Sequence, residues 1–374
     1  MIQLEPRSQP SRALSLLSPV IAVVLMLVAS AIMLAIMGKP IGQALYVYFF
    51  QPIHEFWLYL TSPGQRAAWI YTPSEVLVKA IPLALIGAGL TICFRANVWN
   101  IGAAGQYTLG AIFAGAVSLY VPEFVPEILL PDSRWIWLPI YIVAGAVGGM
   151  VWAAIPALLR TRFNANEILV SLMLTYVAAL LLDWLVRGPW KDPAGLGFPE
   201  SRNFTEAFLM PVLVPTTRLH LGLVIAVVLA AALTVMMART MRGFEVRVIG
   251  AAPRAGAFAG FSQNRTIWFV LLVSGGMAGL AGAIEVSATV QQLQPDISAN
   301  YGFVAIIAAF LGRLNPAGAL FGALILAITF IGGENAQIFL KLPKNVTGIF
   351  QGMLLFFLLA CDTLIHYRIR LGGR

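Results

Sequence analysis

Charged residues are scarce in this chain of 374 residues: they make up 11% of it, against about 25% in an ordinary soluble domain. Hydrophobic residues make up 59%, and the mean hydropathy is +0.85. This composition excludes a soluble enzyme, a nucleic-acid-binding protein and a disordered chain. The net charge of +8 does not indicate a nucleic-acid partner, because the basic residues lie in short gaps between apolar runs, as in a membrane protein.

Cysteine and histidine are also few. The two cysteines, Cys93 and Cys361, lie inside apolar runs and are typical of small buried hydrophobes, which excludes a disulfide framework. The three histidines are far apart and lack metal-ligand spacing. The chain has no HExxH, GxSxG, Asp-rich metal motif or GxxxxGK[ST] phosphate loop. We therefore expect no metal, no cofactor, no enzymatic activity and no ATP site of its own.

Long apolar runs dominate what is there. A helix needs about 20 mostly apolar residues to cross a bilayer, and such runs predict an all-α polytopic membrane protein of about ten transmembrane helices, at 14–37, 75–94, 101–121, 136–159, 168–186, 220–238, 266–289, 301–313, 316–333 and 345–364. The longest polar gaps are too short for a soluble domain with its own core. We therefore expect one transmembrane domain over residues 1–374.

The basic residues predict the orientation. With the N-terminus (1–13) in the cytoplasm, the inner segments carry 14 of the 24 basic residues, all arginine, and only 4 of the 16 acids. This asymmetry favours both termini inside. Segment 39–74 is then an outer interfacial segment, because residues 39–60 are rich in aromatic side chains that favour the membrane surface. If residues 39–60 instead cross the membrane, the helix count and the orientation of everything after them change. Residues 188–219 form an outer loop and 239–265 a cytoplasmic loop.

Two interrupted runs carry polar side chains. The 75–94 run continues into FRANVWNIGAAGQ with Asn97, Asn100 and Gln106, and the short 301–313 run ends at RLNPAG with Asn315. Short or broken helices in a transporter point to a substrate path. Asparagine also caps helix ends, and the sequence favours neither interpretation.

Glu285 is the one acid well inside the second half of the chain. A carboxylate buried in a membrane marks a transport path or a partner. Alternatively, it lies about one helical turn from the outer edge, where water solvates it. Glu285 is also the residue on which an ion-coupled secondary transporter, the alternative function, would depend.

The cytoplasmic loop 239–265 is basic, with five arginines, but too apolar for a plain linker. Pro253 is suited to the first turn of a helix and Gly260 to its end, so we expect a short helix near 253–259. One interpretation is an amphipathic helix held on lipid. The other is a docking element for a cytoplasmic partner.

Several segments resemble the membrane permeases of ABC importers for simple sugars and nucleosides, within the branched-chain amino-acid and ribose permease superfamily. They are FRANVWNIGAAGQYTLGA (94–111), NEILVSLMLTYVAALLLDWLVRGPWKDP (166–193), GFPES (197–201), GFEVRVIGAAPRAGAFAG (243–260) and YGFVAIIAAFLGRLNPAGALFGA (301–323). The GPWKDP and GFPES pieces resemble the larger of two unlike permeases. The chain departs from the family pattern at Ala252, where asparagine is usual, and at Gly256, where alanine is usual.

The resemblance implies a type II-like importer permease in a bacterial inner membrane. It implies an ABC ATPase subunit, a second permease (a similar shorter chain or a second copy) and an extracytoplasmic solute-binding protein as partners. The ATPase-coupling residues would be Glu245, Gly250, Pro253, Arg254 and Gly260. The substrate path would include Asn97, Asn100, Gln106, Glu285 and Asn315, and the outer loop 188–219 would meet the binding protein.

Overall fold

The computed structural model describes residues 2–6, 12–124 and 134–371. The chain divides into two compact units, the first formed by residues 1–76 with 325–374 and the second by residues 77–324. Eight described helices are long and apolar enough to cross a membrane, and two shorter apolar helices, Tyr301–Leu311 and Asn345–Cys361, add to them. These ten match the predicted runs in order, so the predicted all-α polytopic architecture is confirmed.

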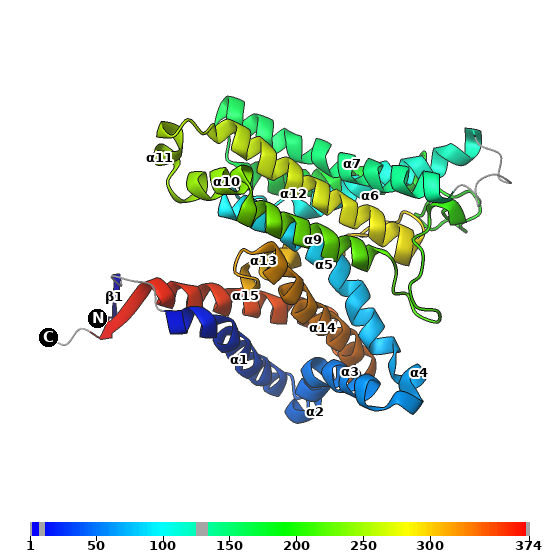
Figure 1. Cartoon of the computed structure of the whole chain (residues 1–374). Helices are drawn as coiled ribbons and strands as arrows, with labels where there is room; N and C mark the ends of the chain where they lie inside the picture. The colour runs from blue at the N-terminus through cyan, green and yellow to red at the C-terminus, as the bar shows by residue number, and fades with distance from the viewer. Residues whose placement is uncertain (1, 7–11, 125–133, 372–374) are drawn as a thin grey trace. The chain divides into compact units, whose positions relative to one another are not determined.

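The first unit is built around two long helices that pack along each other, α1 (Arg12–Ile36) and α15 (Asn345–His366) (Figure 1). Its other elements are β1 (Ile2–Pro6), α2 (Ile41–Leu45), η1 (Tyr46–Phe50), α3 (Gln51–Thr61), η2 (Pro63–Gln65), α4 (Arg66–Trp69), the end of α14 (Pro316–Leu340) and β2 (Tyr367–Leu371).

The segment predicted to lie at the interface is helical through α2, η1 and α3. Its aromatic side chains are of two kinds, exposed and buried. Trp57 is exposed, whereas Tyr48 and Phe49 pack against Phe350 of α15. The ring centroids of Tyr48 and Phe350 are 4.8 Å apart. Gly332 of α14 admits the η1 backbone, since a Cβ there would overlap the Tyr48 carbonyl oxygen. Part of the aromatic pattern is therefore core packing.

The two chain ends pair as antiparallel strands, β1 with β2. The sequence analysis did not predict them, because they form by pairing between residues 2–6 and 367–371, a long-range contact that local patterns do not report. The pairing places the two ends on the same side of the first unit.

The second unit contains most of the membrane-crossing helices (Figure 1). The elements of this unit are the greater part of α5 (Tyr71–Arg95), α6 (Ala103–Phe124), α7 (Arg134–Phe163), α8 (Glu167–Arg187), η5 (Glu206–Phe208), α9 (Gly222–Arg239), α10 (Met241–Ala251), α11 (Pro253–Phe258), α12 (Gln263–Glu285), η6 (Val286–Val290), α13 (Tyr301–Leu311) and the start of α14. The short helices η5, α10 and α11 are not among the candidate membrane spans.

Three helices, α6, α7 and α12, cross at close range to form the core of this unit. A Cβ on Gly279 of α12 would overlap the Gly145 carbonyl oxygen of α7, and a Cβ on Gly110 of α6 would overlap Gly279 itself. The spacings Gly145–Gly149 and Gly275–Gly279 are the small-residue pattern that lets helix backbones approach in a membrane. These glycines are the positions at which the helix backbones approach one another most closely at this crossing.

We predict that Gly279→Ala destabilises the protein by about 1–3 kcal/mol, because the new methyl group must push apart two helix backbones. Thermal unfolding of the purified chain, followed by size-exclusion fluorescence, measures this. Gly352→Ala on α15 is the matched control, since a Cβ there meets nothing within 4 Å. If the two variants are equally stable, the close backbone contact at Gly279 does not require glycine, and the prediction is wrong.

Candidate functional site

The connection between α5 and α6, residues 96–102, is a junction that several elements contact. It begins with a helix stop: Asn97 adopts a left-handed conformation with φ of 55°. The Asn97 N–H donates to the Phe94 carbonyl at 3.1 Å, and the Val98 N–H donates to the Cys93 carbonyl at 2.9 Å. These two bonds are the Schellman pattern that satisfies the last carbonyls of a helix. The Asn97 side chain is exposed.

Asn100 and Gln106 lie together in a buried amide network with Ser274 of α12. The Asn100 amide nitrogen donates to Gln106 Oε1 at 2.9 Å and to Ser274 Oγ at 3.0 Å. The Asn100 Oδ1 accepts from Gln106 Nε2 at 3.1 Å and from the Gly102 N–H at 3.1 Å. Because all four hydrogen-bonding positions of the Asn100 amide are used, the network fixes the connection to α6 and α12.

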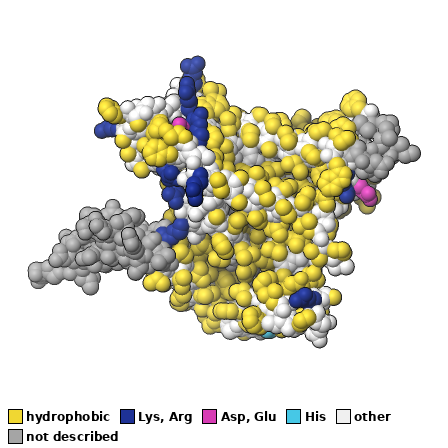
Figure 2. Space-filling view, viewed as in Figure 1, with side chains coloured by type: hydrophobic (Ala, Val, Ile, Leu, Met, Phe, Trp, Pro, Cys, Tyr) yellow, Lys and Arg dark blue, Asp and Glu magenta, His cyan; other side chains and the backbone are white. Residues whose placement is uncertain are grey.

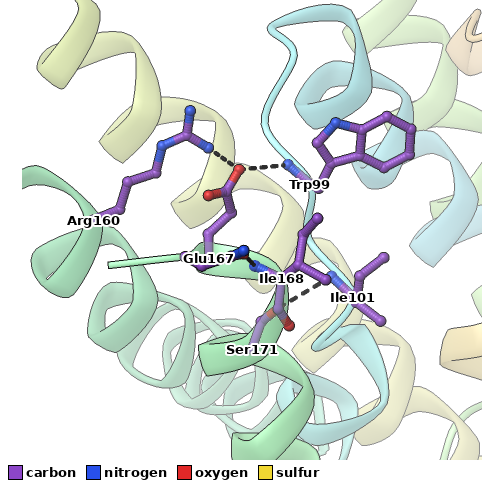
Figure 3. A network of polar contacts seen from close by, with 7 residues as sticks. Trp99, Ile101, Arg160, Glu167, Ile168 and Ser171 are labelled. Carbon is purple, nitrogen blue, oxygen red and sulfur yellow. Dashed lines mark hydrogen bonds and ion pairs between the residues drawn. The ribbon is translucent and has the colours of Figure 1, made fainter. Parts of the chain in front are cut away.

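An ion pair holds the other side of the same connection (Figure 3). Glu167, in the first turn of α8, pairs with Arg160 of α7 and accepts from the Trp99 N–H at 3.3 Å. Ser171, one turn further along α8, accepts from the Ile101 N–H at 3.2 Å. The sequence analysis used Arg160 and Glu167 only to count inner charges. The sequence does contain a signal for this ion pair. An arginine ends one apolar run, and a glutamate stands a few residues later, just before the next run.

The loop of residues 239–265 contacts this connection directly. A Cβ on Gly250 of α10 would overlap the Arg95 carbonyl oxygen, so only glycine allows this approach. The Arg95 side chain in turn donates through Nε to the Leu314 carbonyl at 2.9 Å, at the break between α13 and α14. Residues 95–102 therefore touch α8, α10 and α12, and Arg95 links them to the second helix break.

The remaining predicted coupling residues lie on α10 and α11. Pro253 occupies the first position of α11, and Gly260, with φ of 84°, ends it. The structure thus has a helix over Pro253–Phe258 where the sequence predicted 253–259. Glu245 pairs with Arg242 at 2.9 Å. Arg254 is exposed.

The exposed end of this segment is apolar as well as basic. Phe258, the last residue of α11, is 97% exposed, although Gly256 beside it is buried against α10. A large side chain held outward by a packed backbone is typical of a contact surface. Gly256 stands where the family usually has alanine. The glycine leaves no gap against α10, because a Cβ at this position would lie 3.2 Å from Ile249 Cγ1.

Asn315 and Glu285 lie apart from the amide network. Asn315 is exposed, and its Oδ1 accepts from the Ala317 N–H at 3.2 Å, which caps the start of α14. Glu285 is 6% exposed and ends α12, which continues as a π-helix to Val290. It is eleven residues from Ser274, about 16 Å along the helix. The five predicted path residues therefore do not form one cluster, and their contact with substrate stays a prediction.

The loop of residues 188–219, predicted to lie outside, is held by contacts with the segment after η6. The Ser201 N–H donates to the Leu293 carbonyl at 2.9 Å, and Ser201 Oγ accepts from the Leu293 N–H at 2.9 Å. At the end of the loop, His220 is buried and its Nδ1 accepts from the Gly222 N–H at 3.2 Å. Leu196 and Phe198, in contrast, are largely exposed.

Comparison with known proteins gives the family. The model of the family described as "Branched-chain amino acid transport system / permease component" matches residues 72–359. This chain belongs to that permease family. It is a multi-pass membrane protein and a transport subunit, not an enzyme, as predicted.

Three relatives of this permease are ABC transporter subunits. Glucose ABC transporter permease protein TsgB13 of Haloferax volcanii is 32% identical, over 98% of this chain and 93% of the relative. Guanosine ABC transporter permease protein NupP of Bacillus subtilis is 27% identical, over 91% and 92%. Nucleoside ABC transporter permease protein NupB of Lactococcus lactis is 25% identical, over 76% and 78%. The predicted resemblance to sugar and nucleoside permeases is confirmed.

We predict that Glu167→Gln destabilises the permease by about 1–3 kcal/mol, because Arg160 then lies largely buried without its partner charge. Thermal unfolding measures the effect. Asp183→Asn is the matched control on the same helix, where the pair with Arg187 is solvent-exposed and worth at most about 1 kcal/mol. If Glu167→Gln loses no more unfolding free energy than Asp183→Asn, the Arg160–Glu167 ion pair does not stabilise the α5–α6 connection.

We also predict acid sensitivity at the end of the outer loop. Burial lowers the pKa of His220 from 6.5 to about 4, so the unfolded chain binds a proton there that the folded chain excludes. Stability contributed by neutral His220 is therefore complete above pH 6.5 and falls, by at most about 3 kcal/mol, as the pH decreases to 4.

Comparing the unfolding of wild type and His220→Gln between pH 7 and pH 4 isolates this contribution from that of the carboxylates. The variant should lose less stability on acidification. His54→Gln, which changes an exposed histidine, should behave like wild type. Parallel pH profiles for all three proteins would contradict the assignment.

Proposed function

We propose that this permease forms the translocation path of an ATP-driven ABC importer for nucleosides or simple sugars. The observation that carries the proposal is the α10–α11 segment, which exposes Arg254 and Phe258 while Gly250 rests against the α5–α6 connection. A chain without an ATP-binding motif needs a partner that supplies the energy. An exposed basic and apolar segment packed on the membrane helices suits that contact.

The coupling follows from these contacts. An ATPase that holds α11 would move α10, and the Gly250–Arg95 approach would pass the motion to residues 95–102. From there it would reach α12 through Asn100 and the α13–α14 break through Arg95. Both connections run through hydrogen-bonded groups, and we expect these groups to carry the displacement.

The substrate class is taken from the relatives, whose names specify glucose, guanosine and nucleosides. Amide side chains at the helix breaks, which both donate and accept hydrogen bonds, suit such hydroxyl-rich solutes. In this proposal Asn97 and Asn315, whose side chains are exposed, offer their amides to the solute. Asn100 and Gln106 bond to each other and would shape the path by holding the helix break. Glu285 is assigned to the path because it is buried.

The partners complete the importer. A second permease, either a shorter relative or another copy, would form the other half of the path. A solute-binding protein would deliver substrate at the outer loop, where Leu196 and Phe198 are exposed. We place the chain in the bacterial inner membrane with both ends cytoplasmic, which agrees with the arginine distribution and with the β1–β2 pairing.

One observation favours a second candidate, an ion-coupled secondary transporter. Glu285 is buried at the end of a membrane helix, and buried acids are typical of ion and proton paths. In that case transport would follow a sodium or proton gradient without ATP and would be lost in Glu285→Gln.

We predict that Arg254→Glu and Phe258→Ala each reduce the amount of ATPase that co-purifies with the tagged permease by about tenfold or more, because a central contact residue is worth about 2 kcal/mol. Quantitative mass spectrometry of the gently solubilised complex measures the ratio of the two chains.

Arg265→Glu is the matched control, since it makes the same charge change at an exposed site in the first turn of α12. It should retain the ATPase. Unchanged ATPase recovery in both coupling variants would reject the docking surface. Purification of the permease without any ATPase, together with gradient-driven uptake, would instead support the second candidate.

A further inference from the structure

A small cavity in the second unit holds two arginines on the side of the cytoplasmic loop. It has a volume of about 140 Å³ and lies where the end of α9, α10, the end of α5 and the α13–α14 break meet. Arg95 and Arg247 are among its lining residues, together with Asn315 and Pro316 at the start of α14. No acidic residue is among the described residues that line it.

Both guanidinium groups are fixed in place by backbone carbonyls. Arg95 donates through Nε to the Leu314 carbonyl at 2.9 Å, and Arg247 donates through Nη1 to the Met237 carbonyl. A guanidinium carries five N–H donors, so these bonds orient each group and leave donors for another acceptor. The nearby N-terminal end of α14, a helix of 25 residues, adds a partial positive charge. The cavity is therefore suited to an anion with several acceptor oxygens.

The surroundings of the cavity are apolar. Met237, Ala238 and Leu314 line it beside the arginines. Along α9, Val227, Val228 and other apolar side chains are exposed, as expected of a helix that faces lipid. Figure 2 shows that the surface of the second unit changes from basic to hydrophobic. Basic side chains gather by α10 and α11, and hydrophobic side chains cover the length of α9.

We propose that this cavity binds the phosphate of an anionic phospholipid headgroup, with the acyl chains lying along α9. A free phosphate would satisfy the arginines but would not use the apolar lining or the adjoining helix face. Basic pockets between membrane helices on the cytoplasmic side are suited to such headgroups. The site would place a lipid against Arg95 and Arg247, and so against the contact between the α5–α6 connection and α10.

The test uses the full chain, purified with the subunits that accompany it in a neutral detergent. Binding of dioleoyl phosphatidylglycerol and of dioleoyl phosphatidylcholine is titrated by native mass spectrometry, with and without inorganic phosphate as competitor. We expect preferential binding of phosphatidylglycerol. In Arg95→Gln/Arg247→Gln its affinity should fall about thirtyfold, since each arginine near the surface is worth about fivefold.

Two further variants distinguish a loss of lipid binding from a loss of folding. Thr234→Phe retains both arginines but fills the cavity from α9, and it should also abolish the preference for phosphatidylglycerol. Arg162→Gln/Arg265→Gln removes two exposed arginines outside the cavity and should bind like wild type.

Three results would overturn the proposal. The first is equal affinity for the two lipids. The second is a phosphatidylglycerol affinity that is unchanged in both the double arginine variant and Thr234→Phe. The third is saturation by inorganic phosphate without any lipid preference, which would identify a free-anion site. Because none of these measurements involves ATP or transport, failure here leaves the proposed importer function standing.

Discussion

The close crossing of α6, α7 and α12 is the constraint on which the second unit depends. In a lipid bilayer the hydrophobic effect does not drive helices to associate with one another. Their association therefore relies on close backbone approach and van der Waals packing. Gly110, Gly145 and Gly279 permit that approach. Once these helices are fixed, the start of α6 and the middle of α12 are fixed too, and the Asn100 network can close between them.

The helix breaks satisfy a second requirement of the membrane, that backbone polar groups find partners inside the protein. After α5, the left-handed Asn97 and the Asn100 side chain supply those partners. After α13, Asn315 and the Arg95 side chain do so. Capping and a role in transport do not exclude each other here. A break that is held by hydrogen bonds keeps its shape and still offers the discontinuity that a transport path uses.

Residues 95–102 connect these parts. Glu167 and Ser171 of α8 bond to them on one side, and Ser274 of α12 bonds to Asn100 on the other. Gly250 of α10 approaches the Arg95 carbonyl oxygen. The same short connection therefore contacts the proposed coupling element, the proposed lipid cavity and the membrane core. A buried amide network and a largely buried ion pair therefore meet at this connection, in a chain with few charges.

Much of the fold could be predicted from the sequence by itself, because its cause is local. A run of about twenty apolar residues favours a membrane helix largely independently of its neighbours, so the eight long helices and the all-α class were predicted with nearly correct bounds. The short helix at Pro253 follows in the same way, since a proline at its first position and a glycine after its end act within one turn.

Only the tertiary structure decided which polar residues meet. Asn100 and Ser274 are 174 positions apart, and their bond depends on how α6 crosses α12. The same holds for Glu167 with Trp99 and for Gly250 with Arg95. Glu285 is buried although its position near a helix end was equally compatible with solvation. Periodicity reports that a residue is in a helix, whereas burial and partnership depend on neighbours that are distant in the chain, and for that physical reason the site needed the structure.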